Sequence, residues 1–332
     1  MANQTVYFKT KPKIIGVYSI AGPKEAESDF GRFIKETLTD DTFGESTFEK
    51  AECKMLSRAI DKAIKISGLN EKDINALLSG DLLNQIISAS FAARDFEFPY
   101  IGLYNACSTF SEALALSAAL IDGGYFHNTV AATGSHFATA ERQYRYPLEL
   151  GSTRPPQSQW TVTGAGAAVV SDDNRGDFPK ITSATFGRVV DFGITDVNNM
   201  GSAMAPACAD TLAALFTETN SSPDDYDLIL SGDLGALGSK ILKKLCRDKG
   251  FEIEDKHADC GEMIYNFNED EYQGGSGAGC SAVVFTSMIY DKLLRKEIKK
   301  MIFIATGALL STLSSEQGES IPGVAHAIIL EA

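Results

Sequence analysis

Asp73-Ile-Asn-Ala-Leu-Leu-Ser-Gly-Asp-Leu82 decides the fold, because this segment returns later in the chain as Asp225-Tyr-Asp-Leu-Ile-Leu-Ser-Gly-Asp-Leu234. Six of the ten positions are identical, at an offset of 152 residues. Such self-similarity indicates a repeated structural unit, and the 332 residues of the chain are enough for two units of ordinary size. The sequence therefore predicts two duplicated halves, an N-terminal half over 1–175 and a C-terminal half over 176–332.

A second set of segments supports the duplication at an offset of 173 residues. Ala106-Cys-Ser108 returns as Gly279-Cys-Ser281, and Ala132-Thr-Gly-Ser135 returns as Ala305-Thr-Gly-Ala308. The cysteine and the threonine lie 26 residues apart in both halves. The growth of the offset from 152 to 173 predicts about 21 extra residues in the second half, within 255–273.

Local patterns predict the secondary structure of each unit. The apolar residues of 56–67 follow the i, i+3, i+4 spacing of an amphipathic helix, and 110–121 is apolar nearly all round. A capping box of Thr109 and Glu112 is predicted to start this second helix. Further predicted elements are a helix over 281–294 and strands over 77–78, 99–104, 128–133, 164–171, 301–306 and 324–330.

The order of these elements predicts the fold class. Alternating strands and helices imply mostly parallel sheets. A helix with almost no polar face must be buried on every side, so two sheets are expected to enclose the apolar helices. The sequence therefore predicts an α/β fold, a five-layered αβαβα sandwich built from the two duplicated halves.

Charge and composition exclude several classes of protein. The net charge of −14 argues against nucleic acid as a partner, since nucleic-acid-binding proteins need a basic face. The six cysteines lie far apart without a CxxC pair, so neither disulfides nor a zinc site are expected. The polar segment 1–13 lacks the apolar core of a signal peptide. The longest apolar run, 113–121, is too short to span a bilayer.

Cys107 directly precedes the apolar helix, and this position suits both an anion site and a nucleophile. Unpaired amides and the helix dipole favour negative charge there. Ser135 and His136 lie at the strand end beside this helix, and the loop 274–277 either presents amides to an anion or forms a tight turn. The predicted ligand-binding residues are Cys107, Ser108, Ser135, His136, Gly275 and Ser276, without metal ligands.

A group of short motifs is spread along nearly the whole chain. The motifs are Gly22-Pro-Lys-Glu25, Ser79-Gly-Asp-Leu-Leu-Asn-Gln85, Asn105-Ala-Cys-Ser-Thr109, Ser135-His136, Ala140-Glu-Arg-Gln143, Thr161-Val-Thr-Gly164, Gly193-Ile-Thr-Asp196, Met200-Gly-Ser-Ala-Met-Ala-Pro206 and Ala305-Thr-Gly-Ala-Leu-Leu-Ser311. Together they resemble the stage V sporulation protein AD family of the thiolase-like superfamily. This resemblance implies a non-catalytic protein that binds dipicolinic acid, pyridine-2,6-dicarboxylate, alone or as its calcium chelate, for uptake into the developing spore. It also implies a peripheral place at the inner spore membrane beside membrane proteins of the same operon, a homodimer that pairs through an edge strand, and no cofactor.

The alternative function is an acyltransferase of the thiolase or ketoacyl-synthase type, with Cys107 as its nucleophile. The superfamily resemblance implies that such enzymes activate the cysteine with histidine, or with histidine and asparagine, from loops of the second half. The corresponding loops here, 231–234 and 274–277, contain no histidine. A third possibility is a purely structural subunit of the membrane assembly.

Two acidic features are interpreted as structural. Asp81 and Asp233 occupy equivalent places in the two repeats, which favours a turn or cap role over chemistry. The run Asn266-Phe-Asn-Glu-Asp-Glu271 has oxygen ligands that suit calcium but lacks the spacing of an EF-hand, so we interpret it as a solvated loop.

Overall fold

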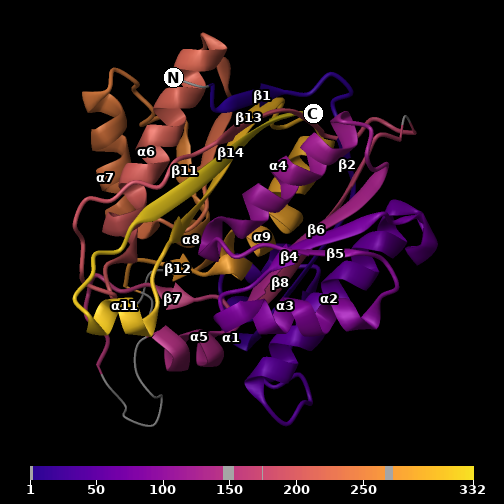
Figure 1. Ribbon diagram of the computed structural model, residues 1–332, viewed down its shortest axis with the longest axis horizontal. Coiled ribbons are helices and arrows are strands. Elements are labelled where there is room, and N and C mark those ends of the chain that lie inside the picture. The colour runs from indigo at the N-terminus through magenta and orange to yellow at the C-terminus, as the bar shows by residue number, and fades with distance from the viewer. Residues whose placement is uncertain (1–2, 145–152, 174, 266–271) are drawn as a thin grey trace.

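Helices and strands alternate along the chain, as Figure 1 shows for the computed structural model. The structure describes residues 3–144, 153–173, 175–265 and 272–332. The helices are α1 Pro23–Glu27, α2 Phe48–Ser67, α3 Ile87–Ala92, α4 Thr109–Asp122, α5 Phe137–Tyr144, α6 Met200–Thr219, α7 Gly235–Asp248, α8 Cys260–Ile264, α9 Ala278–Val284, α10 Tyr290–Leu294 and α11 Thr312–Glu316. The strands are β1 Thr5–Tyr7, β2 Lys13–Ala21, β3 Glu36–Thr37, β4 Ala76–Gly80, β5 Tyr100–Gly102, β6 Asn128–Ser135, β7 Trp160–Thr161, β8 Gly164–Ser171, β9 Lys180–Phe186, β10 Leu228–Ser231, β11 His257–Asp259, β12 Gly275–Ser276, β13 Lys300–Ala308 and β14 Gly323–Glu331.

Each half of the chain builds a sheet with the same order of strands. In the first half the order is β2-β8-β6-β4-β5, and in the second half it is β9-β14-β13-β10-β11. The central strand pairs are parallel, whereas β8 and β14 run antiparallel to both of their neighbours. The two sheets join where Lys13 of β2 pairs with Lys180 of β9. The boundary predicted after residue 175 lies in the connection between β8 and β9.

Helices cover both sheets and fill the space between them (Figure 1). On the outside of the first sheet, α2 contacts β2, β8 and β6, and on the outside of the second sheet α6 contacts β14 and β13. Between the sheets, α4 contacts strands of both halves, and α9 packs on β6 and β8. This arrangement confirms the predicted five-layered sandwich.

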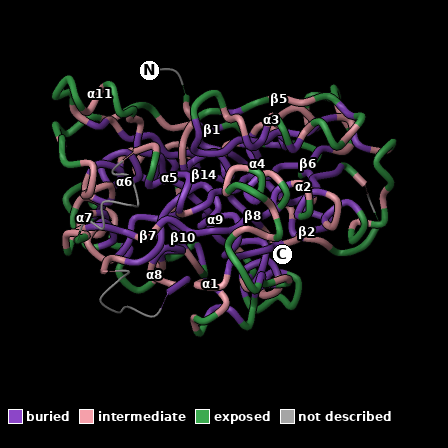
Figure 2. The backbone as a smooth tube through the Cα atoms, turned by 90° about the horizontal axis from the view of Figure 1, so that it is seen from below, coloured by how far each residue is buried: buried purple, intermediate pink, exposed green. Residues whose placement is uncertain are grey.

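The middle layer is held by a buried aromatic cluster. Phe110 of α4 lies with its ring centroid 5.9 Å from that of Phe285 and 6.1 Å from that of Phe303 of β13. Phe285 begins a π-helical turn, Phe285–Ile289, that joins α9 to α10, so the helix predicted over 281–294 continues from Ala278 to Leu294. Figure 2 shows that buried backbone occupies the interior and that exposed backbone is confined to the periphery.

The start of α4 differs from the prediction. The helix spans Thr109–Asp122, close to the predicted 110–121, but the capping box is wrong. Thr109 is already helical, and its hydroxyl donates to the carbonyl oxygen of Ala106 at 2.7 Å. A 3-10 turn over Ala106–Ser108 precedes α4 and takes the place of a side-chain cap.

The extra residues of the second half follow β11. This strand pairs with β10 in parallel, as β5 pairs with β4, so the two halves still correspond at this point. After it come α8 and then β12, which pairs with β7 of the first half. The run Asn266–Glu271, interpreted above as a solvated loop, lies outside the described residues.

Phe110→Ala is expected to lower the free energy of unfolding by about 3–5 kcal/mol, because it removes a fully buried ring and leaves a cavity beside two other rings. Chemical denaturation followed by circular dichroism measures this loss. Tyr125→Ala replaces a side chain that is 77% exposed, and it is expected to change the same quantity by less than about 0.5 kcal/mol. Equal effects of the two substitutions would contradict the packing of the middle layer.

Candidate functional site

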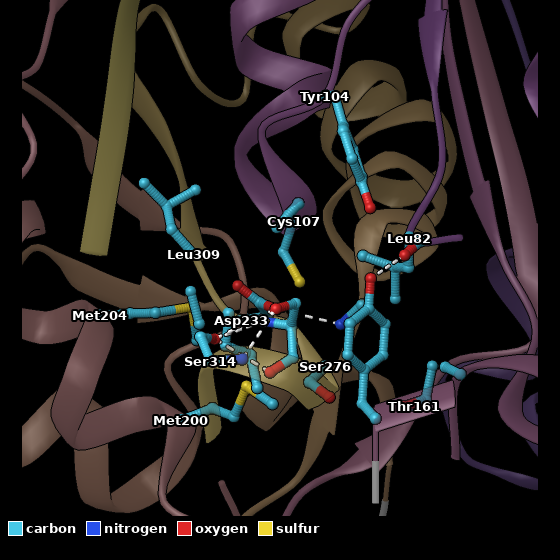
Figure 3. A pocket seen from close by; sticks show the side chains of 17 residues that line it. Leu82, Tyr104, Cys107, Thr161, Met200, Met204, Asp233, Ser276, Leu309 and Ser314 are labelled. Carbon is cyan, nitrogen blue, oxygen red and sulfur yellow. Dashed lines mark hydrogen bonds between the residues drawn. The ribbon is translucent and has the colours of Figure 1, made fainter. Parts of the chain in front are cut away.

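A cavity of about 340 Å³ lies where the ends of β4, β10 and β13 meet the start of α4. Crevices at the carboxyl ends of strands are the usual place for ligands in α/β proteins. Figure 3 shows the Cys107 side chain pointing toward Asp233, with Ser276 close to both. These three residues form the polar floor of the cavity, and they come from both halves of the chain.

The turn before α4 holds Cys107 in place. Ala106 has φ +52°, a left-handed conformation that is unfavourable for a residue with a side chain. Side-chain hydrogen bonds stabilise this turn, because the Ser108 hydroxyl donates to the carbonyl oxygen of Asn105 at 2.7 Å and Thr109 binds that of Ala106. The cysteine therefore lies at a fixed helix start, 8% exposed and facing the cavity.

Asp233 follows β10 and is fully buried. Its Oδ2 accepts a hydrogen bond from the Gly277 amide at 3.0 Å, and its Oδ1 accepts one from the Thr306 hydroxyl at 2.9 Å. Burial raises the pKa of this carboxyl to about 7, against hydrogen bonds from Cys107, Gly277 and Thr306 that favour the ionised form. Asp233 is thus an acid that changes its charge near neutral pH.

A second buried carboxylate fixes the loop that carries Asp233. Asp259, at the end of β11, accepts hydrogen bonds from the amides of Leu234 and Gly235, both at 2.9 Å. It also accepts one from the Ser231 hydroxyl at 2.6 Å. Burial raises the pKa of Asp259 to about 6. The loop is therefore anchored from behind, on the side away from the cavity.

Apolar side chains form the walls of the cavity, and a few hydroxyl groups lie among them. Leu82, Ala140 and Cys107 belong to one buried apolar cluster, and Met204 and Leu309 line the opposite wall. The Tyr144 hydroxyl donates to the carbonyl oxygen of Leu82, which ties α5 to the segment after β4. Tyr104, Thr161, Ser311 and Ser314 add the hydroxyl groups.

The structure brings two of the six predicted site residues, Cys107 and Ser276, to this cavity. The Ser135 hydroxyl is instead engaged in backbone contacts, since it donates to the carbonyl oxygen of Val162 at 2.7 Å and accepts from the Gly279 amide at 3.0 Å. Ser108 binds the backbone of its own turn, and Gly275 lies in β12 beside the lining residues.

His136 directly precedes α5 and is not among the residues that line the cavity. Its Nδ1 accepts from the Ala138 amide at 3.1 Å, so its Nε2 carries the proton and donates to the carbonyl oxygen of Asp41 at 2.8 Å. Burial lowers the pKa of this imidazole. His136 borders a separate hollow with Phe48 and Trp160. Both of its nitrogens serve the local backbone, so it contributes no donor to the Cys107 site.

The cavity contains neither a histidine nor a positive charge among its described lining residues. None of the four histidines of the chain borders it, and Asp233 is the one charged side chain among the lining residues that the structure describes. The expectation that the second-half loops supply no histidine to Cys107 therefore agrees with the geometry. The site offers a thiol, a carboxyl group, hydroxyl groups and apolar surface.

Sequence reasoning missed several lining residues. Asp233 was interpreted as a turn residue, although it belonged to the repeated Ser-Gly-Asp motif that indicated its place at a strand end. Met200 and Met204 lay within a motif noted for its resemblance only. Tyr104 and Tyr144 carried no signal of their own, because their approach to Cys107 depends on tertiary packing.

Solved structures define the class of this fold. The 3-oxoacyl-[acyl-carrier-protein] synthase III from Aquifex aeolicus VF5 has a TM-score of 0.60 and 14% identity, covering 97% of this chain and 100% of that one. A cerulenin-bound variant of OleA from Xanthomonas campestris has a TM-score of 0.63 and 12% identity, covering 100% of both chains. The fold is therefore thiolase-like.

Within that class, the chain belongs to the stage V sporulation protein AD family. The family model described as Stage V sporulation protein AD (SpoVAD) matches residues 2–331. The stage V sporulation protein AD of Bacillus subtilis (strain 168) is 43% identical over 328 residues, which cover 99% of this chain and 96% of the relative. In the described part of the chain, no helix has the length and apolar character needed to cross a bilayer.

Cys107 is expected to be the first thiol that a small uncharged alkylating reagent modifies in the native protein, because it faces the cavity. Burial raises the thiol pKa of Cys53 to about 11 and those of Cys208, Cys260 and Cys280 well above normal, which slows their reaction. Intact-mass analysis and peptide mapping after brief iodoacetamide treatment measure this order. Cys107→Ala should lose the first adduct, and first labelling at Cys53 would contradict the prediction.

Proposed function

We propose that this chain binds dipicolinate, alone or as its calcium chelate, in the cavity at Cys107, and that this binding serves uptake of the compound into the developing spore. The proposal rests on membership of the sporulation family together with one observation. That observation is a cavity with a polar floor, apolar walls and a helix N-terminus, but without a histidine.

The chemistry of the cavity suits a small planar dicarboxylate. Its volume of about 340 Å³ is at the lower end of the range for small-molecule sites, which fits a single aromatic ring with two substituents. Leu82, Ala140 and Met204 offer apolar surface to the ring. The start of α4 favours negative charge, and the Ser276 and Thr161 hydroxyls are donors to carboxylate oxygens.

The same geometry weighs against acyl transfer by Cys107. Nucleophilic catalysis by a thiol needs a base within hydrogen-bond reach and donors for the developing oxyanion. The group nearest to that role is Asp233, which accepts a hydrogen bond from Cys107 but whose two oxygens also accept backbone and hydroxyl hydrogen bonds. The solved enzymes named above support the fold alone. We therefore assign the cavity to binding.

Location and partners form part of the proposal. A chain of this family without a described membrane-spanning helix would reach the inner spore membrane through other proteins, for which we propose the membrane proteins of the same operon. In this arrangement the chain presents dipicolinate to the membrane assembly from its surface.

Ala140→Leu is expected to weaken dipicolinate binding by more than about tenfold, because the added side-chain atoms enter the ligand space beside Leu82 and Cys107. Isothermal titration calorimetry with and without calcium measures this effect. Ala214→Leu makes the same change at a half-buried position of α6 that does not line the cavity, and it should bind as the wild type does. Equal affinity of both variants for dipicolinate would show that the ligand does not bind in this cavity. Absence of binding to the wild type would reject the proposal.

We also propose a homodimer that pairs through a sheet edge. The outermost strand of the first half is β5, which has a partner on one side only, β4. An unpaired edge offers free backbone donors and acceptors to a second copy. Size-exclusion chromatography with light scattering should give twice the 35.7 kDa of one chain. A wild-type mass of 35.7 kDa would contradict the dimer.

A further inference from the structure

The surroundings of Asp233 are unfavourable for a second negative charge. The carboxyl group is fully buried and lines the cavity, and each of its oxygens already accepts one hydrogen bond. The described titratable groups that are found to interact with it are one further carboxyl group and several thiols, and none of these is basic. The titratable groups that interact with it are Asp259, Cys107, Cys208, Cys260 and Cys280, and Tyr104 and Tyr144 share the cavity.

An anionic ligand in this cavity would therefore come close to Asp233, and the described lining residues offer no cation to compensate. Like charges in a buried site repel strongly, and protonation of one carboxyl group removes this repulsion at the lowest cost in free energy. A protonated Asp233 also becomes a hydrogen-bond donor, whereas the ionised group only accepts. Protonation thus removes a repulsion and adds a donor for a carboxylate of the ligand.

We propose that Asp233 couples the binding of free dipicolinate to the uptake of one proton, so that the cavity discriminates between ligands by their charge. The free dianion binds with a protonated Asp233, and the neutral calcium chelate binds without this requirement. The inference rests on the proposed function, because it concerns the same cavity and ligand. When the dianion binds, one proton passes from the solvent to a carboxylate oxygen of Asp233. No other covalent bond is made or broken.

The direction of the pH dependence follows from the charge of Asp233. Its pKa of about 7 means that the protonated form prevails at pH 6 and the ionised form at pH 8.5. Carboxyl groups of the ligand, like those of ordinary acids, are ionised throughout this range. The dissociation constant of free dipicolinate should therefore rise by about tenfold or more from pH 6 to pH 8.5, whereas that of the chelate should change by less than about twofold.

Calorimetric titration of the full-length wild type tests this coupling directly. Dipicolinate is titrated in metal-free buffers of different ionisation enthalpy, at pH 6 and pH 8, and then with excess calcium. The expected uptake for the free ligand is about one proton at pH 8 and much less at pH 6, with little uptake for the chelate at either pH. Tight binding that is independent of pH, with no proton uptake, would overturn the inference while leaving the proposed function intact.

Substitutions then assign the proton to its residue. Asp233→Asn cannot titrate and should bind free dipicolinate with the same affinity at pH 6 and pH 8.5, without proton uptake. Asp81→Asn is the matched control, because Asp81 is the buried equivalent of Asp233 in the first half and does not line the cavity. It should retain the pH dependence of the wild type. Loss of the dependence in Asp81→Asn, or its persistence in Asp233→Asn, would contradict the assignment, and the wild-type measurement stands even if a variant fails to fold.

Discussion

The structure depends on the burial of one apolar helix between two sheets. Its composition predicted that the helix is enclosed on every side, but this is wrong because Leu116, Ala119 and Leu120 are only half-buried. α4 has almost no polar face, and it contacts strands of both sheets. A helix of this kind is stable only inside, and its burial requires two sheets that are themselves covered by outer helices. The layer order therefore follows from the composition of this helix. Its N-terminal turn ends between the two halves, which brings Cys107 within reach of residues such as Asp233 that follow second-half strands.

Much of this architecture was predictable from the sequence, because duplication and hydrophobic pattern are strong signals. The two copies of the Ser-Gly-Asp motif indicated equivalent strand ends, and the strand predicted over 164–171 coincides with β8. The start of α4 was not predictable in the same way. Thr109 and Glu112 had the spacing of a capping box, but the left-handed Ala106 allows a 3-10 turn that hydrogen-bonds to the Thr109 hydroxyl instead. Local spacing could not reveal this competing conformation.

Two of the six predicted residues, Cys107 and Ser276, line one cavity, whereas the places of the other four depend on side-chain direction. Ser135 ends β6 next to the cavity, yet its hydroxyl turns into the structure and binds the backbone. His136 follows it, and Asp41 and Ala138 use both of its ring nitrogens. Proximity along the chain to a strand end does not decide which way a side chain points. The direction of a side chain depends instead on backbone groups that need hydrogen-bond partners, and these groups come from distant segments of the chain.

The two halves show why equivalent aspartates have different roles. Asp81 accepts hydrogen bonds from the amides of Leu83 and Ala89, both at 2.7 Å, so it holds the turn after its own strand. In the second half, Asp259 binds the corresponding turn. The strand register explains this difference, because Ser79 pairs with Gly102, whereas Ser231 pairs with Asp259.

Gly102 has no carboxylate, so in the first half Asp81 itself accepts the hydrogen bonds of the turn. Because the carboxylate of Asp259 binds the turn after β10, Asp233 can accept hydrogen bonds from Gly277 and Thr306 at the cavity instead. The acid on the neighbouring strand therefore accounts for the difference between the two equivalent residues: Asp81 binds its own turn, whereas Asp233 lines the cavity. The duplication of the motif argued for a structural role in both halves. The difference between the two adjacent strand ends explains why only Asp233 of the two lines the cavity.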